Sequence, residues 1–147
     1  MKILIVEDDA SLQELMQLYL ADFGTCDIAG DGVNALEIVN KAIEDQQPYD
    51  LICMDIMMPR MNGMEAMKKI RQIEFKHFDQ GFPSAKIIMI TAKDMAKDML
   101  NAYHAGCEAY LTKPFSREKL LEQLRELGLI KTPDDPHEPT WNQRAKL

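Results

Sequence analysis

Short apolar runs alternate with amphipathic helical segments along this chain, and the alternation narrows the possible folds sharply. The segments with the length and composition of β-strands are 2–7, 26–29, 50–54, 86–90 and 107–112. Those with apolar residues at helical spacing are 10–23, 33–46, 63–74, 94–105 and 116–127. Such β–α units form an open parallel sheet with helices on both faces. We expect an α/β fold, a doubly wound five-stranded parallel sheet with five helices.

Polar residues stand at the ends of four of these runs. Glu7 and Asp8 end the first run, Asp55 follows the third, Thr91 the fourth and Lys113 the fifth. Parallel strands end at one edge of a sheet, where ligands bind. Carboxylates that meet there repel one another unless a cation such as Mg²⁺ joins them, and a carboxylate beside Mg²⁺ can accept a phosphoryl group. The pattern predicts a Mg²⁺-dependent acceptor site at this edge, centred on Asp55.

Charge and hydropathy exclude several classes of protein. The net charge of −7 argues against nonspecific binding to nucleic acid and to anionic membranes. No apolar run approaches the roughly 18 residues of a membrane span, and the N-terminal run is too short for a signal peptide. We expect a cytoplasmic protein with one folded domain over 1–129. Residues 130–147 lack periodicity and are predicted to be a disordered tail.

The cysteines and the segment 74–84 add no residues to the predicted acceptor site. The cysteines 26, 53 and 107 fit no metal-binding pattern and are interpreted as buried small apolar residues. The segment 74–84 carries three phenylalanines and is either a partner surface or an extension of the preceding helix whose rings fold back on the domain. Of these alternatives, the helix extension is favoured.

Four motifs carry a resemblance to a known family. They are Ile3–Asp9, Asp55–Pro59 with Asn62–Gly63, Met89–Ala92 and Tyr110–Phe115. With these motifs in this order, the chain resembles the receiver domain of bacterial two-component response regulators over residues 1–129. The resemblance is in particular to single-domain chemotaxis receivers. The resemblance implies a flavodoxin-like strand order 2-1-3-4-5.

The resemblance also implies roles for individual residues. Asp55 would be the phosphoacceptor, and Mg²⁺ would be bound by Asp8, Asp55 and the backbone carbonyl of Met57, with Glu7 acting through water. Lys113 and Thr91 would assist catalysis by contacting phosphoryl oxygens.

Two more features of the family concern the switch aromatic and the peptide bond that aims Lys113 at the site. Tyr110 would be the switch aromatic that turns inward when Thr91 moves toward the phosphate. The Lys113–Pro114 peptide bond is expected to be cis.

Some positions depart from the family pattern. The acidic pair is Glu7–Asp8 instead of two aspartates, and the spacing from Asp55 to Thr91 is long, which the 74–84 segment explains. Met57 and Lys93 occupy positions that influence phosphoryl hydrolysis. Because an apolar Met57 cannot orient an attacking water, we predict a long-lived aspartyl phosphate.

The sequence therefore predicts a stand-alone response regulator that a histidine kinase or phosphotransfer protein phosphorylates on Asp55. It would be a switch that assists its own phosphorylation and dephosphorylation, not a turnover enzyme. The predicted readout face is 94–127, and output through protein contacts is expected because the roughly 18 residues after 129 are too few for a DNA-binding module. We expect a monomer or a weak phosphorylation-dependent dimer, without contact to nucleic acid or membrane. A diffusible output protein and a phosphorelay intermediate are both compatible with this pattern.

Two alternatives belong to other functional classes. A phosphate-independent receiver-like binding module would not need the polar residues at the strand ends. A small Mg²⁺-dependent phosphohydrolase would use Asp55 as nucleophile, but it would need a general acid two residues later, where Met57 stands.

Overall fold

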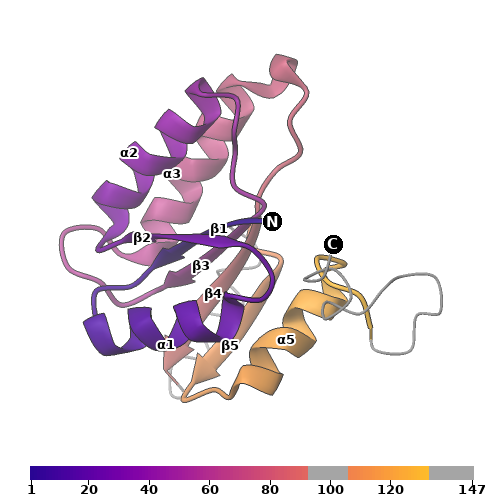
Figure 1. The fold of residues 1–147 in the computed structure, drawn as a ribbon. Helices are drawn as coiled ribbons and strands as arrows, with labels where there is room; N and C mark the ends of the chain where they lie inside the picture. The colour runs from indigo at the N-terminus through magenta and orange to yellow at the C-terminus, as the bar shows by residue number, and fades with distance from the viewer. Residues whose placement is uncertain (93–105, 133–147) are drawn as a thin grey trace.

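A computed structural model describes residues 1–92 and 106–132 and shows a five-stranded parallel sheet in the order β2-β1-β3-β4-β5 (Figure 1). The strands are β1 (Lys2–Val6), β2 (Thr25–Ala29), β3 (Leu51–Asp55), β4 (Lys86–Ala92) and β5 (Ala109–Lys113), and the helices are α1 (Ala10–Leu20), α2 (Gly32–Glu44), α3 (Gly63–Lys76), the 3-10 helix η1 (Phe78–Gln80) and α5 (Arg117–Glu126). The predicted doubly wound, flavodoxin-like fold is confirmed. The helix predicted over 94–105 lies outside the described residues.

The helices cover both faces of the sheet and create two separate cores. Helices α2 and α3 pack on one face, where Val39 and Met67 meet strand residues such as Leu4. Helices α1 and α5 pack on the other face, where Met16 and Leu124 belong to the same buried cluster as Ile3 and Ile5. Because neighbouring residues of a strand point to opposite faces, β1 contributes to both cores and has to be apolar throughout.

The bounds of α1 and α2 follow from a side-chain cap at one end and a change of backbone conformation at the other. Asp9 caps α1 by accepting hydrogen bonds from the backbone N–H groups of Ser11 and Leu12. Helix α2 ends at Glu44, before Pro48, because Gln46 adopts a positive φ of 60° that breaks the helix.

The strands of the functional edge extend slightly further than predicted. Asp55 and Lys113 are the last residues of β3 and β5, and Thr91 is the penultimate residue of β4. β4 is buried from Ile87 to Thr91, whereas β5 alternates between buried and half-buried residues, as predicted for an edge strand. Backbone pairing with the neighbouring strands therefore fixes the positions of these three site residues.

The predictions for the cysteines are largely confirmed, whereas the prediction for the segment 74–84 is confirmed only in part. Cys53 and Cys107 are buried as predicted, and Cys26 is half-buried. Helix α3 continues to Lys76 and η1 follows, so the helix extension is confirmed, but the rings do not fold back: Phe75 is 80% exposed and Phe78 is 78% exposed. The end of α3 and η1 lie beyond the edge of the sheet, where no strand is available for the rings to cover (Figure 1).

The C-terminal part after α5 is described only as far as residue 132. Leu129 and Ile130 pack against the α1–α5 core. The rest of the predicted tail, 133–147, lies outside the described residues. Within residues 1–92 and 106–132, no helix has the length and apolar composition that crossing a bilayer requires.

Candidate phosphoacceptor site

The carboxyl ends of β1, β3 and β5 bring three predicted site residues into direct contact. The Nζ atom of Lys113 lies 2.9 Å from Oδ2 of Asp55 and 3.4 Å from Oε2 of Glu7. Glu7 and Asp55 are almost completely buried, with exposed fractions of 1% and 3%. A buried carboxylate is stable only with partners, and here one ammonium group serves two carboxylates.

The two oxygens of the Asp55 carboxylate have different partners. Oδ2 accepts the hydrogen bond from Lys113, and Oδ1 accepts one from the backbone N–H of Met57 at 3.1 Å. These contacts fix the plane of the carboxylate at the end of β3. Asp55 is therefore held in one orientation, as a reacting group requires.

The electrostatics of the site show an excess of negative charge. Burial, followed by the charge of Asp55, raises the pKa of Glu7 to about 7, although the N–H of Asp9 and the ammonium of Lys113 act in the opposite direction. Partial burial disfavours the charged form of Lys113, but the hydrogen bond and charge of Asp55 outweigh it and raise the pKa of this lysine.

The donor set fits a hard divalent cation. Carboxylate oxygens of Glu7, Asp8 and Asp55 lie within 4.8 Å of one another. Asp8 is exposed, whereas the other two are buried, so the group opens to solvent on one side. Oxygen ligands from one or two carboxylates, completed by water, are what Mg²⁺ binds. After burial, repulsion from Asp55 is the next cause of the raised pKa of Glu7, and the charge of the ion would relieve this repulsion.

The turn after Asp55 depends on a glycine whose role the sequence analysis did not assign. A Cβ atom on Gly63 would lie 2.2 Å from the carbonyl oxygen of Asp55, and the N–H of Gly63 donates to the carbonyl of Ile56 at 2.9 Å. Asn62 caps α3 by accepting from the N–H of Glu65. Helix α3 thus starts directly against the backbone of the acceptor, which only a residue without a side chain permits.

A second feature that the sequence analysis missed joins two loops at this edge. Arg60, which has a positive φ of 65°, forms an ion pair with Asp31 and donates from Nε at 2.9 Å. Asp31 also caps α2, and the N–H of Asn34, followed by Arg60, lowers its pKa. No local sequence signal links these residues, since they belong to different β–α connections.

Thr91, Tyr110, Pro114 and Met57 were also predicted as site residues. Thr91 is 1% exposed, and its hydroxyl lies 3.4 Å from the carbonyl oxygen of Ala92. Tyr110 is half-buried and packs against the α2–α3 core. The Lys113–Pro114 peptide bond is cis. The side chain of Met57 is largely exposed.

Comparison with known proteins agrees with the fold and with this geometry. The family of response regulator receiver domains matches residues 3–125, and the chain belongs to it. Over 126 residues the chain is 36% identical to a probable transcriptional regulator, ycf29, of Porphyra purpurea, a match that covers 85% of this chain and 55% of that protein. The chain spans about half the length of such curated relatives.

Two solved structures resemble the chain over most of its length. The receiver domain of the sensor histidine kinase PA1611 from Pseudomonas aeruginosa, with magnesium coordinated in its active-site cleft, has a TM-score of 0.69 and 31% identity, covering 85% of this chain and 94% of that one. The receiver domain of Ssk1, crystallised with the phosphotransfer protein Ypd1 of Saccharomyces cerevisiae, has a TM-score of 0.74 and 28% identity, covering 92% and 94%.

Proposed function

We propose that this receiver domain accepts a phosphoryl group on Asp55 from a histidine kinase or phosphotransfer protein and thereby switches a protein-interaction face. The observation that carries the proposal is the buried Asp55 carboxylate, held 2.9 Å from Lys113 within an acidic cluster. Membership of the receiver family supports the signalling role.

The proposed reaction uses the acceptor in its ionised form. A carboxylate oxygen of Asp55 attacks phosphorus, the P–N bond of a donor phosphohistidine breaks, and its electron pair leaves with the imidazole, which is neutral once its other nitrogen is protonated. Lys113 neutralises negative charge at the acceptor as a point charge. The hydrogen bond from Met57 N–H keeps the carboxylate plane fixed during the transfer.

The metal in this proposal is Mg²⁺, and Glu7, Asp8, Asp55 and the carbonyl of Met57 would hold it. When bound, it would supply positive charge that offsets the charge of the incoming phosphoryl oxygens. Glu7 is buried and contacts Lys113, so it is placed to act through a bound water. Magnesium in the cleft of the similar PA1611 receiver domain supports this choice of ion.

The proposed switch runs through Thr91 on β4 and Tyr110 on β5. Thr91 is paired with Thr112, and Met89 is paired with Tyr110, so the hydroxyl and the aromatic ring lie on adjacent strands. A new phosphoryl group on Asp55 would attract the Thr91 hydroxyl and allow Tyr110 to change position. The readout face would include β5 and α5, together with 94–105, which lies outside the described residues.

The proposed donor is a protein that carries a phosphohistidine. The complex of the Ssk1 receiver with the phosphotransfer protein Ypd1 supports a protein donor for this chain. A switch of this kind changes its binding to partners and does not turn over an external substrate.

Intact mass spectrometry tests the proposal directly. The full chain is incubated with acetyl phosphate and Mg²⁺, alongside Asp55→Asn and the matched control Asp79→Asn, which removes an exposed carboxylate on η1. We expect the mass of one phosphoryl group on the native chain and on Asp79→Asn, no gain on Asp55→Asn, and no gain with a chelator.

Two results would contradict the proposal. Phosphorylation of Asp55→Asn to the native extent would place the acceptor elsewhere. A native chain that is folded but takes up no phosphoryl group from acetyl phosphate, or from a phosphorylated phosphotransfer protein, would support a phosphate-independent binding module.

A further inference from the structure

An aromatic surface lies at the end of the molecule opposite the phosphoacceptor site. Phe75, Phe78 and Phe82 are three of the five phenylalanines in the chain, and they are 80%, 78% and 37% exposed. They lie on the last turn of α3, on η1 and on the connection to β4, and we call them the aromatic face. Exposed rings at this density are unusual on a monomer, since each costs free energy in water.

A pocket opens beside these rings. It has a volume of about 190 Å³ and is lined by Ile43 and Pro48 from the end of α2 and the following loop, and by Phe75, Phe78, Phe82 and Pro83. An apolar cavity of about 150 Å³ accommodates a benzene molecule. The pocket therefore has the size and composition to accept one aromatic ring.

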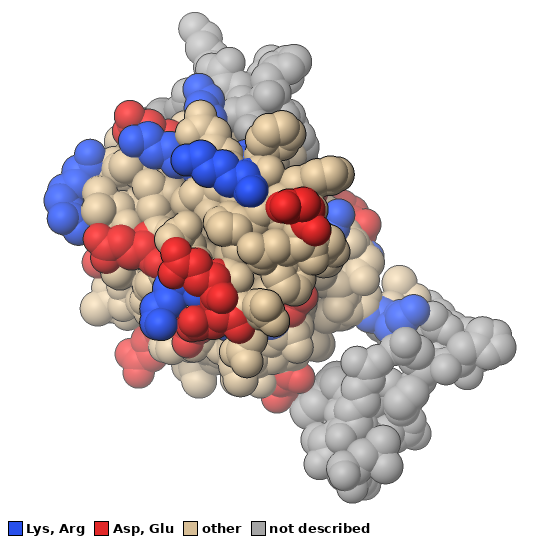
Figure 2. Space-filling view, turned by 90° about the horizontal axis from the view of Figure 1, so that it is seen from above, with Lys and Arg blue, Asp and Glu red and all other residues tan. Residues whose placement is uncertain are grey.

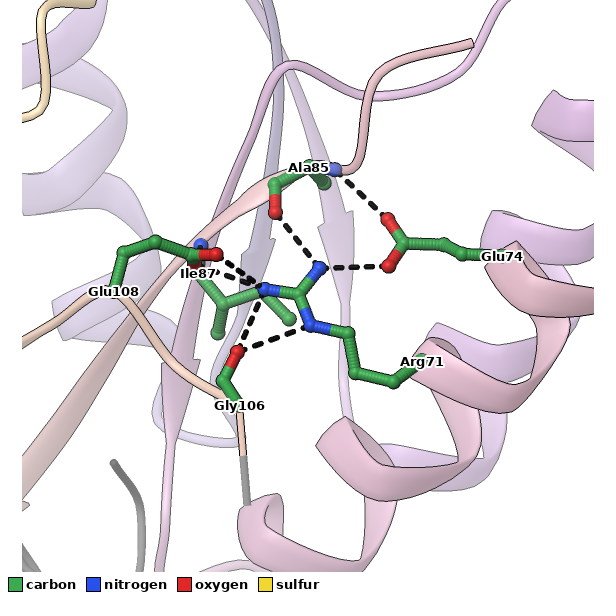
Figure 3. A network of polar contacts seen from close by, with 6 residues as sticks. All are labelled: Arg71, Glu74, Ala85, Ile87, Gly106 and Glu108. Atoms are coloured by element: carbon green, nitrogen blue, oxygen red, sulfur yellow. Dashed lines mark hydrogen bonds and ion pairs between the residues drawn. The ribbon is translucent and has the colours of Figure 1, made fainter. Parts of the chain in front are cut away.

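The polar wall of the pocket is already fixed (Figure 3). The guanidinium of Arg71 donates to the carbonyl oxygens of Gly106 and Ala85 at 2.8–3.0 Å and forms ion pairs with Glu74 and Glu108. Glu74 in turn accepts from the N–H of Ala85 at 2.8 Å. We call this set of contacts the Arg71 network. Because these groups satisfy one another, the pocket is preformed and offers its apolar walls to a ligand.

The size of the aromatic face matches the apolar centre of a dimer interface. With a phenylalanine presenting roughly 200 Å², the three exposed fractions correspond to about 400 Å² of aromatic surface. A standard interface buries about 800 Å² per partner, and somewhat more than half of it is apolar. The aromatic face would thus supply most of the apolar area that such an interface needs.

The charges around the aromatic face do not oppose contact between two copies. Lys76 and Asp79, which flank the rings, are both exposed and have opposite signs, and Lys41 and Asp45 at the end of α2 pair at 3.3 Å. Figure 2 looks onto this end of the molecule: uncharged side chains occupy the centre, and side chains of both signs lie around them. The net charge of −7 is therefore not concentrated on this surface.

We propose that the aromatic face is the interface of a symmetric homodimer, in which Phe78, an exposed ring that lines each copy's own pocket, packs against the pocket of the other copy. The face carries both exposed rings and a pocket large enough for one ring, and a two-fold axis pairs such complementary features reciprocally. This dimer differs from the one expected through 94–127, because its centre is formed by the phenylalanines of residues 75–82 and it does not depend on phosphorylation.

Sedimentation equilibrium of the full, unphosphorylated chain over a wide concentration range tests this proposal. We expect the mass to rise toward twice that of the monomer. Phe78→Asp should weaken the dimer at least tenfold, since it places a charge in the apolar centre. The matched control is Leu18→Asp on α1, which introduces the same charge at a side chain that is 69% exposed, far from the aromatic face. Circular dichroism checks that both variants are folded.

The outcomes separate the possible occupants. A native chain that stays monomeric at every concentration, or a Leu18→Asp variant that weakens the dimer as much as Phe78→Asp, overturns the proposal. The same holds if Phe78→Asp changes the fluorescence of Trp141, the single tryptophan, in dilute monomer, because the C-terminal segment would then occupy the pocket. Dimerisation that is unchanged in Asp55→Asn supports it and separates it from the phosphoacceptor function.

Discussion

Replacing Arg71 by methionine should destabilise the domain substantially. Methionine keeps an unbranched apolar stem and a high helix propensity, so the change isolates the guanidinium group. That group joins α3 to the start of β4 and to the segment before β5 (Figure 3). These segments are distant in sequence, and without Arg71 their polar groups lose a shared partner.

The magnitude follows from the burial of the Arg71 network. The side chains of Arg71, Glu74 and Glu108 are 20%, 15% and 27% exposed, so solvent compensates only part of the loss. Breaking a buried ion pair from one side costs about 3–5 kcal/mol. Glu108 keeps its hydrogen bond from the N–H of Ile87, and Glu74 keeps the one from Ala85. We therefore expect the lower end, a loss of about 3 kcal/mol in the free energy of unfolding.

Urea denaturation at 25 °C measures this loss. With a denaturant dependence of about 2 kcal/mol/M, the midpoint should fall by about 1.5 M. The control is Arg117→Met, which removes an arginine whose pair with Asp22 spans 3.5 Å and is well exposed on both sides. Exposed pairs contribute about 1 kcal/mol or less, so its midpoint should move little. If Arg71→Met lost no more stability than Arg117→Met, the Arg71 network would not hold these segments together.

Three other predictions concern the phosphoacceptor site. Because the pKa of Glu7 is raised from about 4.5 to about 7 on folding, stability present at low pH should be lost as the pH rises through this window. In a chelator, Glu7→Gln should therefore exceed the native chain in urea resistance at pH 8, by no more than about 3 kcal/mol, and equal it near pH 4. If the stability difference between Glu7→Gln and the native chain instead grew toward acidic pH, the pKa of Glu7 would be lowered on folding and this prediction would be wrong. Gly63→Ala should lower the free energy of unfolding by at least about 2 kcal/mol and slow phosphorylation by acetyl phosphate, because its Cβ would overlap the Asp55 carbonyl. The control Gly30→Ala, whose Cβ would have no atom within 4 Å, should change neither. The aspartyl phosphate of the native chain should persist for minutes or longer when it is followed by intact mass. Met57→Asn should shorten this lifetime, because its amide can orient an attacking water. A native lifetime of seconds would count against this role of Met57.

The sequence alone determined the sheet, the layers and the residues at the functional edge. Strand and helix periodicities are local properties, and the apolar runs that end at Glu7 and Asp55 could be recognised without any knowledge of contacts. Once the strands are parallel, their carboxyl ends have to share one edge, which brings Lys113 to the same place. The strand order itself came from resemblance to the receiver family.

Only the tertiary structure decided which partners these residues have and how solvent reaches them. The pairing of Lys113 with Asp55, the raised pKa of Glu7 and the overlap that restricts Gly63 all depend on distances between elements. The exposure of Phe75 depends on where the sheet ends relative to α3, which periodicity does not encode. Local sequence thus fixes the type of each element, whereas partners, burial and pKa arise from packing between segments that are distant along the chain.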